Sequence, residues 1–197
     1  MDTVGRSVLA VAKYAMIKLL CFAYLPSDKI KKGYFPQRGD ISFQEDKVFF
    51  TKADAYIVGN EMDQYYFDKV LNIKSVVYPE LSGCNYGEWS GHFFDEIPPH
   101  HLSQWVEDAS YSPSNGESRQ EVYKRVGKWL DQTSSYKGKV VLILRPEIIK
   151  AMVLISVGAT YKDENRVDVF PNTWSVISKT KSLKLQVLSS FSLAGDV

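Results

Sequence analysis

The chain has 197 residues, of which 45% are hydrophobic and 24% are charged, values that are typical of a soluble globular protein. The 24 Lys and Arg residues and 23 Asp and Glu residues leave a net charge of +1, so bulk charge predicts attraction neither to nucleic acid nor to an anionic membrane. Its two cysteines, Cys21 and Cys84, form neither a disulfide framework nor a metal-ligand spacing. We therefore expect free thiols, no metal, no cofactor and a cytoplasmic location.

The N-terminal segment contains the longest apolar stretch. Residues Val8 to Leu25 are rich in apolar side chains, but Lys13 and Lys18 interrupt the run and no small-residue cleavage site follows it. A membrane-spanning helix would need about 20 uninterrupted apolar residues. We therefore predict a buried strand at Ile17–Leu25, preceded by a loose leader or short helix over residues 1–15, and no membrane association.

Short apolar runs alternate with amphipathic stretches along the rest of the chain, and they predict strands and helices respectively. In chain order they are strand Ala55–Val58, helix Glu61–Leu71, strand Ile73–Val77, helix Glu117–Leu130, strand Val140–Leu144, helix Pro146–Val157, and strands Ser175–Ser178 and Leu183–Leu188. This alternation predicts one domain over residues 1–197, a three-layer α/β/α sandwich with a mostly parallel central sheet.

Two loops in the middle of the chain are candidates for the functional site. Leu81–Gly91 contains three glycines, and Ser110–Gly116 combines Ser, Pro and Asn. Because open α/β sheets bind ligands beyond the carboxyl ends of their strands, we expect these loops to border a site. Pro98–His101 is interpreted as a solvated turn, and none of the three histidines has a partner at zinc-like spacing, so no metal site is predicted.

Three segments follow one another along the chain: Leu81–Gly91, Pro113–Ser118 with the helix after it, and Val140–Lys150. Together they resemble the histidine phosphatase superfamily, especially its branch of bacterial alpha-ribazole phosphatases. Leu81–Gly91 is similar to the family pattern L-x-E-x-x-(F/Y)-G-x-W-x-G. Pro113–Ser118 and the helix after it are similar to P-(H/G)-G-G-E-S followed by R-V-x-x-W-L, and Val140–Lys150 is similar to V-x-V-V-(T/S)-H-G-x-V-I-R. Phe170–Ile177 is similar to the last-strand segment of the family. The resemblance implies the phosphoglycerate-mutase-like fold.

The resemblance also implies a site for phosphate monoester hydrolysis. In the family, a histidine in an R-H-G motif attacks phosphorus, while two arginines and a second histidine neutralise the charge of the phosphoryl group. A carboxylic acid protonates the leaving oxygen.

This chain departs from the family pattern at each of these positions. The family register puts Ala23 at the first arginine, Tyr24 at the nucleophile, Gly83 at the general acid and Arg145 at the second histidine. The other arginine falls within Asn60–Asp63, where we assign it to Met62, and no Arg or Lys occurs between Ala53 and Asp68.

Two of these replacements are polar, and each has two interpretations. Arg145 either binds an anion in the former pocket or closes that pocket with a salt bridge to Glu117 or Glu147. Tyr24 either acts as an acid–base group or fills space in the core, since a phenol with a pKa near 10 is ionised in only about one molecule in a thousand at pH 7. The candidate ligand-binding residues are Arg145, Tyr24, Ser27, Glu117 and Ser118.

Two functions from different classes remain open at this point. The first is a pseudophosphatase that binds a small anion, such as phosphate or a carboxylate, or a protein partner, with a homodimer also open. The second is a repurposed lyase, isomerase or cyclase that acts on an acidic metabolite, with Arg145 as the anion anchor and Tyr24 as the acid–base group. Residual phosphomonoesterase activity is a more distant third. The basic cluster of Lys29, Lys31, Lys32 and Arg38 is predicted to be a solvated loop.

Overall fold

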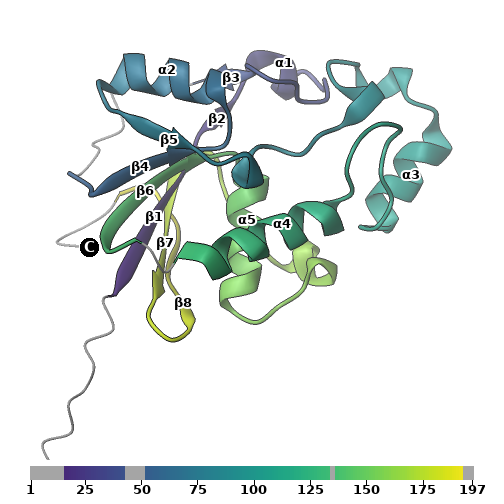
Figure 1. Cartoon of the computed structure of the whole chain (residues 1–197). Helices are drawn as coiled ribbons and strands as arrows, with labels where there is room; N and C mark the ends of the chain where they lie inside the picture. The colour runs from purple at the N-terminus through teal and green to yellow at the C-terminus, as the bar shows by residue number, and fades with distance from the viewer. Residues whose placement is uncertain (1–15, 43–51, 134–135, 193–197) are drawn as a thin grey trace, which may run out of the picture.

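The structure, a computed structural model, describes residues 16–42, 52–133 and 136–192 (Figure 1). The predicted leader over residues 1–15 lies outside these ranges. The strands are β1 (Ile17–Ala23), β2 (Leu25–Pro26), β3 (Ile41–Ser42), β4 (Ala55–Val58), β5 (Ser75–Val77), β6 (Gly138–Leu144), β7 (Thr173–Lys179) and β8 (Leu183–Ser190). The α-helices are α1 (Asp28–Lys31), α2 (Glu61–Leu71), α3 (Pro99–Glu107), α4 (Arg119–Gln132) and α5 (Pro146–Ser156).

A six-stranded sheet organises the described residues, with the strand order β5-β4-β6-β1-β7-β8. The pairs β5–β4, β4–β6 and β6–β1 are parallel, whereas β7 runs antiparallel to both β1 and β8. The mostly parallel sheet predicted from the sequence is therefore confirmed. Its four parallel strands end at the same edge, which is where loops from distant parts of the chain come together.

The two faces of the sheet are covered by different helices, which makes the three predicted layers (Figure 1). Successive side chains of a strand point to opposite faces, so β1 contributes to two cores. Leu20, Phe22 and Tyr24 pack with Phe67 of α2 on one face. The intervening residues of β1, including Ala23, pack with α4 and α5 on the other face.

The first strand is shorter than predicted. Leu25 and Pro26 do not continue β1 but form β2, which pairs with β3 in a separate two-stranded sheet. Proline has no N–H to donate to a sheet ladder, which is consistent with the chain leaving the main sheet before Pro26. Tyr24 therefore lies between the two sheets, directly after the end of β1.

The prediction of a solvated turn at Pro98–His101 is wrong about the turn, because α3 begins at Pro99 with Pro98 as its cap, but Pro98, Pro99 and His100 are exposed as predicted. Pro99 stands at the first helical position, where a missing N–H is tolerated. Leu102 and Trp105 of this helix pack against a small aromatic core that is separate from the sheet. That core contains Phe35, Tyr86, Trp89 and Ile97.

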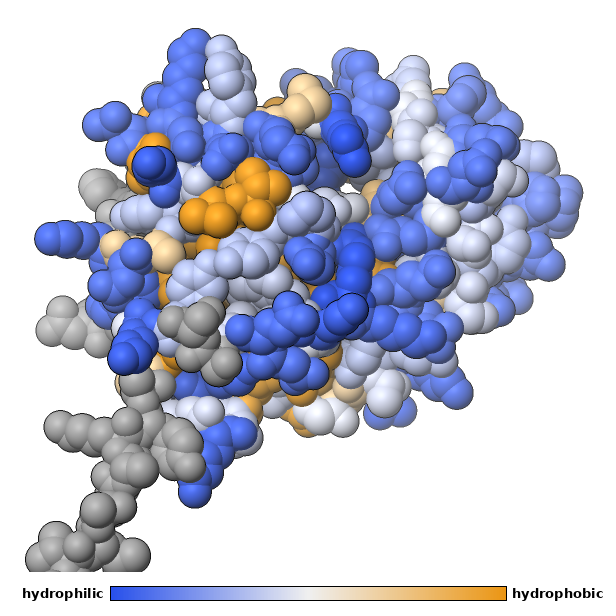
Figure 2. Space-filling model, viewed as in Figure 1, coloured by the Kyte–Doolittle hydropathy of each residue, from blue (hydrophilic) through white to orange (hydrophobic). Residues whose placement is uncertain are grey.

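The face of the molecule seen in Figure 2 is mainly hydrophilic, with a hydrophobic patch over the region where Figure 1 draws β5. Val76 of this edge strand is exposed. Within the described residues, no helix combines the length and the apolar character needed to cross a membrane.

Candidate functional site

The polar residues of the candidate site meet at the carboxyl edge of the parallel strands. Tyr24 follows β1, Arg145 follows β6, and Gly83 lies in the segment after β5. The backbone N–H of Tyr24 donates to the carbonyl oxygen of Leu144 at 3.1 Å, which holds the ends of β1 and β6 together. The structure thus brings together Tyr24 and Arg145, which are more than a hundred positions apart in the chain.

Tyr24 is a core residue with its hydroxyl bound internally. It is 1% exposed, its ring lies 5.4 Å from that of Phe67, and its hydroxyl donates to Oδ2 of Asp63 at 3.2 Å. Burial raises the pKa of Tyr24 well above its ordinary value, and the nearby Asp63 and Glu147 carboxylates raise it further, although Arg145 acts in the opposite direction. The phenol therefore stays protonated at neutral pH.

Arg145 is a buried cation beside this phenol. It is 8% exposed, and its Nη2 donates to the carbonyl oxygens of Gln37 at 3.1 Å and Asp40 at 3.4 Å. Its guanidinium carbon lies 5.7 Å from the centre of the Tyr24 ring, within the range of a cation–π contact. Burial disfavours its charge, but the nearby Tyr24, Glu147 and Asp63 groups outweigh burial and raise its pKa, so Arg145 stays charged.

Gly83 and Arg145 are coupled by their packing. A Cβ atom added to Gly83 would lie 2.5 Å from Cδ and 2.7 Å from Nε of Arg145, closer than side-chain atoms approach one another in proteins. The Arg145 side chain therefore occupies the space that any side chain at position 83 would need. Gly83 and Arg145 therefore form one packing unit.

Asp63, rather than Met62, is the residue of α2 that points into the site. Asn60 caps this helix by accepting from the backbone N–H groups of Met62 and Asp63, both at 3.0 Å. Asp63 is then 3% exposed, whereas Met62 is 51% exposed. Burial raises the pKa of Asp63 more than Arg145 lowers it, and Oδ1 of Asp63 has no hydrogen-bond partner among the described residues.

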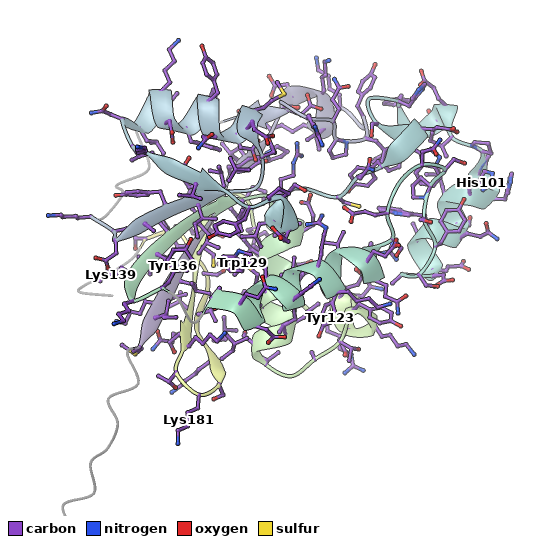
Figure 3. The ribbon with its side chains drawn as sticks, in the orientation of Figure 1. His101, Tyr123, Trp129, Tyr136, Lys139 and Lys181 are labelled. Atoms are coloured by element: carbon purple, nitrogen blue, oxygen red, sulfur yellow. The ribbon has the colours of Figure 1, made fainter. Side chains whose placement is uncertain are left out.

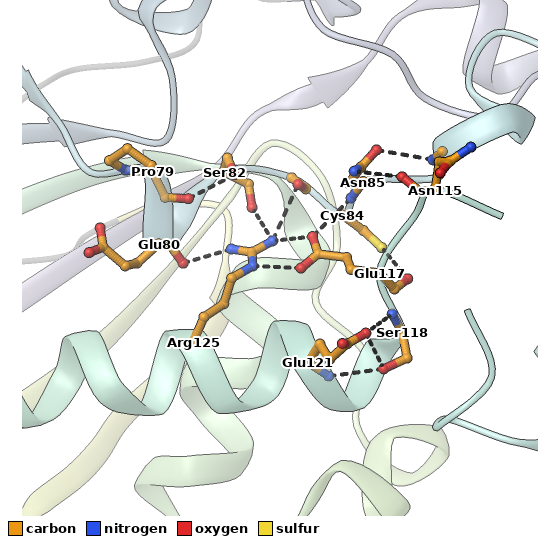
Figure 4. A network of polar contacts seen from close by, with 12 residues as sticks. Pro79, Glu80, Ser82, Cys84, Asn85, Asn115, Glu117, Ser118, Glu121 and Arg125 are labelled. Atoms are coloured by element: carbon orange, nitrogen blue, oxygen red, sulfur yellow. Dashed lines mark hydrogen bonds and ion pairs between the residues drawn. The ribbon is translucent and has the colours of Figure 1, made fainter. Parts of the chain in front are cut away.

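The alternative in which Arg145 forms a salt bridge with Glu117 is wrong, because Glu117 pairs with Arg125 of α4 (Figure 4). Nε and Nη2 of Arg125 donate to the two carboxylate oxygens of Glu117 at 2.9 and 2.7 Å. Arg125 also donates to the carbonyl oxygens of Glu80 at 2.6 Å and Ser82 at 2.8 Å. This network ties the loop that contains Gly83 to α4.

The remaining predicted residues are placed as follows. Glu147 influences the pKa of Arg145, but no ion pair joins the two within the part of the chain that the structure describes. Ser118 is buried and caps α4, with its backbone N–H and hydroxyl both bonded to the Glu121 carboxylate, so its hydroxyl is not available to a ligand. The hydroxyl oxygen of Ser27 is buried and has no partner among the described residues.

A polar cavity of about 380 Å³ opens beside Arg145. Its lining includes the side chains of Arg38, Asn60, Ser82, Asn85 and Arg145, together with Gly83. We call it the Arg145 cavity. Within the described residues, only Nη2 of Arg145 is hydrogen-bonded, so Nε and Nη1 remain as donors for a bound molecule.

The histidines lie away from this cavity and do not form a metal site. Nδ1 of His92 is 2.8 Å from Glu96, and Nδ1 of His101 on α3 (Figure 3) is 2.7 Å from the Tyr111 hydroxyl. No group of three His, Cys, Asp or Glu side chains suited to a metal ion occurs among the residues that the structure describes.

Comparison with known proteins identifies the family. The sequence profile of the histidine phosphatase superfamily (branch 1) matches residues 65–188, more than half of the chain. The chain belongs to the histidine phosphatase superfamily. The matched range contains Gly83, Glu117 and Arg145 of this histidine phosphatase homologue, whereas Tyr24 and Asp63 precede it. No curated protein sequence matches the chain.

Solved structures of histidine phosphatases share the fold at low sequence identity. The alpha-ribazole phosphatase from Shigella flexneri superposes with a TM-score of 0.79 at 14% identity, covering 91% of this chain and 100% of that protein. A putative alpha-ribazole-5'-phosphate phosphatase from Escherichia coli superposes with a TM-score of 0.75 at 17% identity, covering 91% and 99%. A mycobacterial glucosyl-3-phosphoglycerate phosphatase gives 0.65 at 14% identity, covering 89% and 99%. These similarities confirm the phosphoglycerate-mutase-like fold.

Proposed function

We propose that this histidine phosphatase homologue does not hydrolyse phosphate monoesters and acts by binding a small anion, phosphate or a carboxylate, in the Arg145 cavity. The observation that carries the proposal is the packing of Arg145. Its charged side chain fills the space beside Gly83, lines the cavity, and keeps Nε and Nη1 without a hydrogen bond among the described residues. A guanidinium is well suited to carboxylate and phosphate oxygens.

The geometry supports the absence of hydrolysis at three points. Tyr24 is protonated and its hydroxyl donates to Asp63, so it offers no deprotonated nucleophile. Gly83 has neither a proton to give to a leaving group nor room for a side chain that has one. Asp63 brings a carboxylate near the place where the family register expects a second arginine. Loss of one stabilising donor commonly costs about 100- to 1000-fold in rate, and here several are lost together.

The same carboxylates limit how tightly an anion binds. Asp63 and Glu147 both lie near enough to Arg145 to raise its pKa, so they offset part of its positive charge. Arg38 in the cavity wall adds a second cation, and Asn60 and Asn85 add amide groups. We therefore expect affinities of about millimolar for simple phosphate or carboxylate ions.

Two measurements test the proposal. The purified protein is first incubated with p-nitrophenyl phosphate, and we expect no turnover above the rate without protein. Phosphate, acetate and citrate are then titrated while backbone amide signals are recorded by NMR, and we expect shifts at the residues that line the Arg145 cavity. The Arg145→Gln variant should lose them, whereas Arg166→Gln, at an exposed arginine, should keep them. Turnover that Tyr24→Phe abolishes would show that the site is catalytic, and absence of shifts with every anion would favour a protein partner.

One observation favours the second function, the repurposed enzyme. Tyr24 and Arg145 both line another cavity of about 250 Å³, in which an acidic metabolite would contact the two side chains that this mechanism needs. The raised pKa of Tyr24 makes its phenol a poor proton donor, so this function is supported less well than binding alone. It predicts turnover of an acidic metabolite that is lost in both Tyr24→Phe and Arg145→Gln.

A further inference from the structure

A separate cavity of about 320 Å³ lies against α4 and α5. Of the residues that line the Arg145 cavity, it shares only Cys84. Val122, Ala151 and Leu154 give it an apolar floor, and the rings of Tyr86 and Tyr123 form part of its wall. Figure 3 shows Tyr123 on α4. We call it the Glu147 cavity.

The charged groups that line the Glu147 cavity are paired, with one exception. Nε of Arg119 lies 2.6 Å from Oε1 of Glu164, and Nζ of Lys150 lies 3.3 Å from Oδ1 of Asp168. The positive and negative charges of these two ion pairs cancel. The Glu147 carboxylate makes no hydrogen bond and no ion pair within the described residues, so the charged side chains of the lining sum to one net negative charge.

Two polar atoms of this lining are buried without a partner among the described residues. They are Oε1 of Glu147, an acceptor, and Nε1 of Trp105, a donor. An unsatisfied buried polar group destabilises the folded state, and native proteins have few of them. Arg145 lies near Glu147, and both residues line the cavity of about 250 Å³, but no hydrogen bond or ion pair joins their side chains within the described residues.

We propose that the Glu147 cavity binds an organic ammonium ion, a protonated amine carried on an apolar or aromatic frame. The ammonium group donates to the Glu147 carboxylate, and the frame packs on the apolar floor between Tyr86 and Tyr123. Arg119 already lies over the ring of Trp105, with its guanidinium carbon 4.8 Å from the ring centre. The ring face of Trp105 is thus already covered by Arg119, so Trp105 contributes its indole N–H, which can donate to a polar substituent of the ligand.

Matched probes test the charge requirement on the wild-type protein. Benzylamine, benzyl alcohol and benzoate share one ring and differ in the polar group, which is cationic, neutral and anionic at pH 7. Each is titrated into the ¹⁵N-labelled protein, with the indole signal of Trp105 assigned through Trp105→Phe. We expect benzylamine to shift that signal and the amides of Glu147 and Lys150 with an affinity about tenfold or more above that of benzyl alcohol, the difference that one charge-assisted bond supplies.

A substitution of the same size as glutamate then tests the role of Glu147. Glu147→Gln should weaken benzylamine binding about tenfold or more, whereas Glu107→Gln, which removes one exposed charge outside this lining, should leave it unchanged. Any of three results would overturn the proposal. They are equal binding of benzylamine, benzyl alcohol and benzoate, no binding of benzylamine, and undiminished binding of benzylamine by Glu147→Gln. These outcomes are independent of the anion titration, which depends on Arg145.

Discussion

Gly83 allows the packing of the candidate site to be tested by a single methyl group. In Gly83→Ala the new Cβ would lie 2.5 Å from Cδ and 2.7 Å from Nε of Arg145. Arg145 cannot easily move away, because its Nη2 is bonded to two backbone carbonyls and its guanidinium lies over Tyr24. Overpacking of this kind costs about 1–3 kcal/mol of unfolding free energy.

The assay is urea unfolding, in which we expect a lower midpoint with an unchanged slope. Gly127→Ala in α4 is the control, because its nearest neighbour would be Cδ1 of Ile155 at an ordinary 3.5 Å and because alanine favours a helix by about 1 kcal/mol. In an Arg145→Ala background, the cost of Gly83→Ala should largely disappear, which gives a coupling energy of the same size as the penalty. Unchanged stability of Gly83→Ala, or an equal penalty in both backgrounds, would refute the steric coupling.

Three further predictions concern stability. Folding raises the pKa of Asp63 above its unfolded value of about 3.9, so the protonated carboxyl stabilises the fold below that pH, and this stabilisation is lost as pH rises through the folded pKa. Asparagine stays neutral, so in urea unfolding Asp63→Asn should become more stable relative to the wild type as pH rises from about 4 to 7. Arg125→Met should lower the free energy of unfolding by about 2–4 kcal/mol in the same assay, because it leaves the half-buried Glu117 carboxylate and the carbonyls of the Gly83 loop unpaired. An equal loss in the exposed control Arg166→Met would contradict this. Lys179→Met should cost about 1–2 kcal/mol of unfolding free energy and so lower the thermal midpoint, since Nζ of Lys179 donates to the carbonyl oxygens of Leu130 and Asp131 at the end of α4. Lys184→Met, at an exposed position of β8, should leave the midpoint unchanged.

Local patterns in the sequence were sufficient for most elements of the sheet layers. The bounds of β4 and α2 agree with the prediction, because an apolar run and an amphipathic stretch with Asn60 as its cap are local signals. The start of α4 was predicted two residues early, since Ser118 is the cap rather than a helical residue. Helix α3 was missed, because the core that its apolar side chains cover includes Phe35, from a distant part of the chain.

For the candidate site, the sequence by itself determined which segments meet. Parallel strands place their carboxyl ends at one edge, and the family resemblance assigned Tyr24, Gly83 and Arg145 to one site there. Only the tertiary structure decided the partners of individual side chains. Which α2 residue faces the core depends on helix phase, so Asp63 rather than Met62 lies near Arg145, and Glu117 pairs with Arg125 because α4 passes directly beneath its loop. Such pairings depend on distances of a few ångströms between segments that the chain order does not specify.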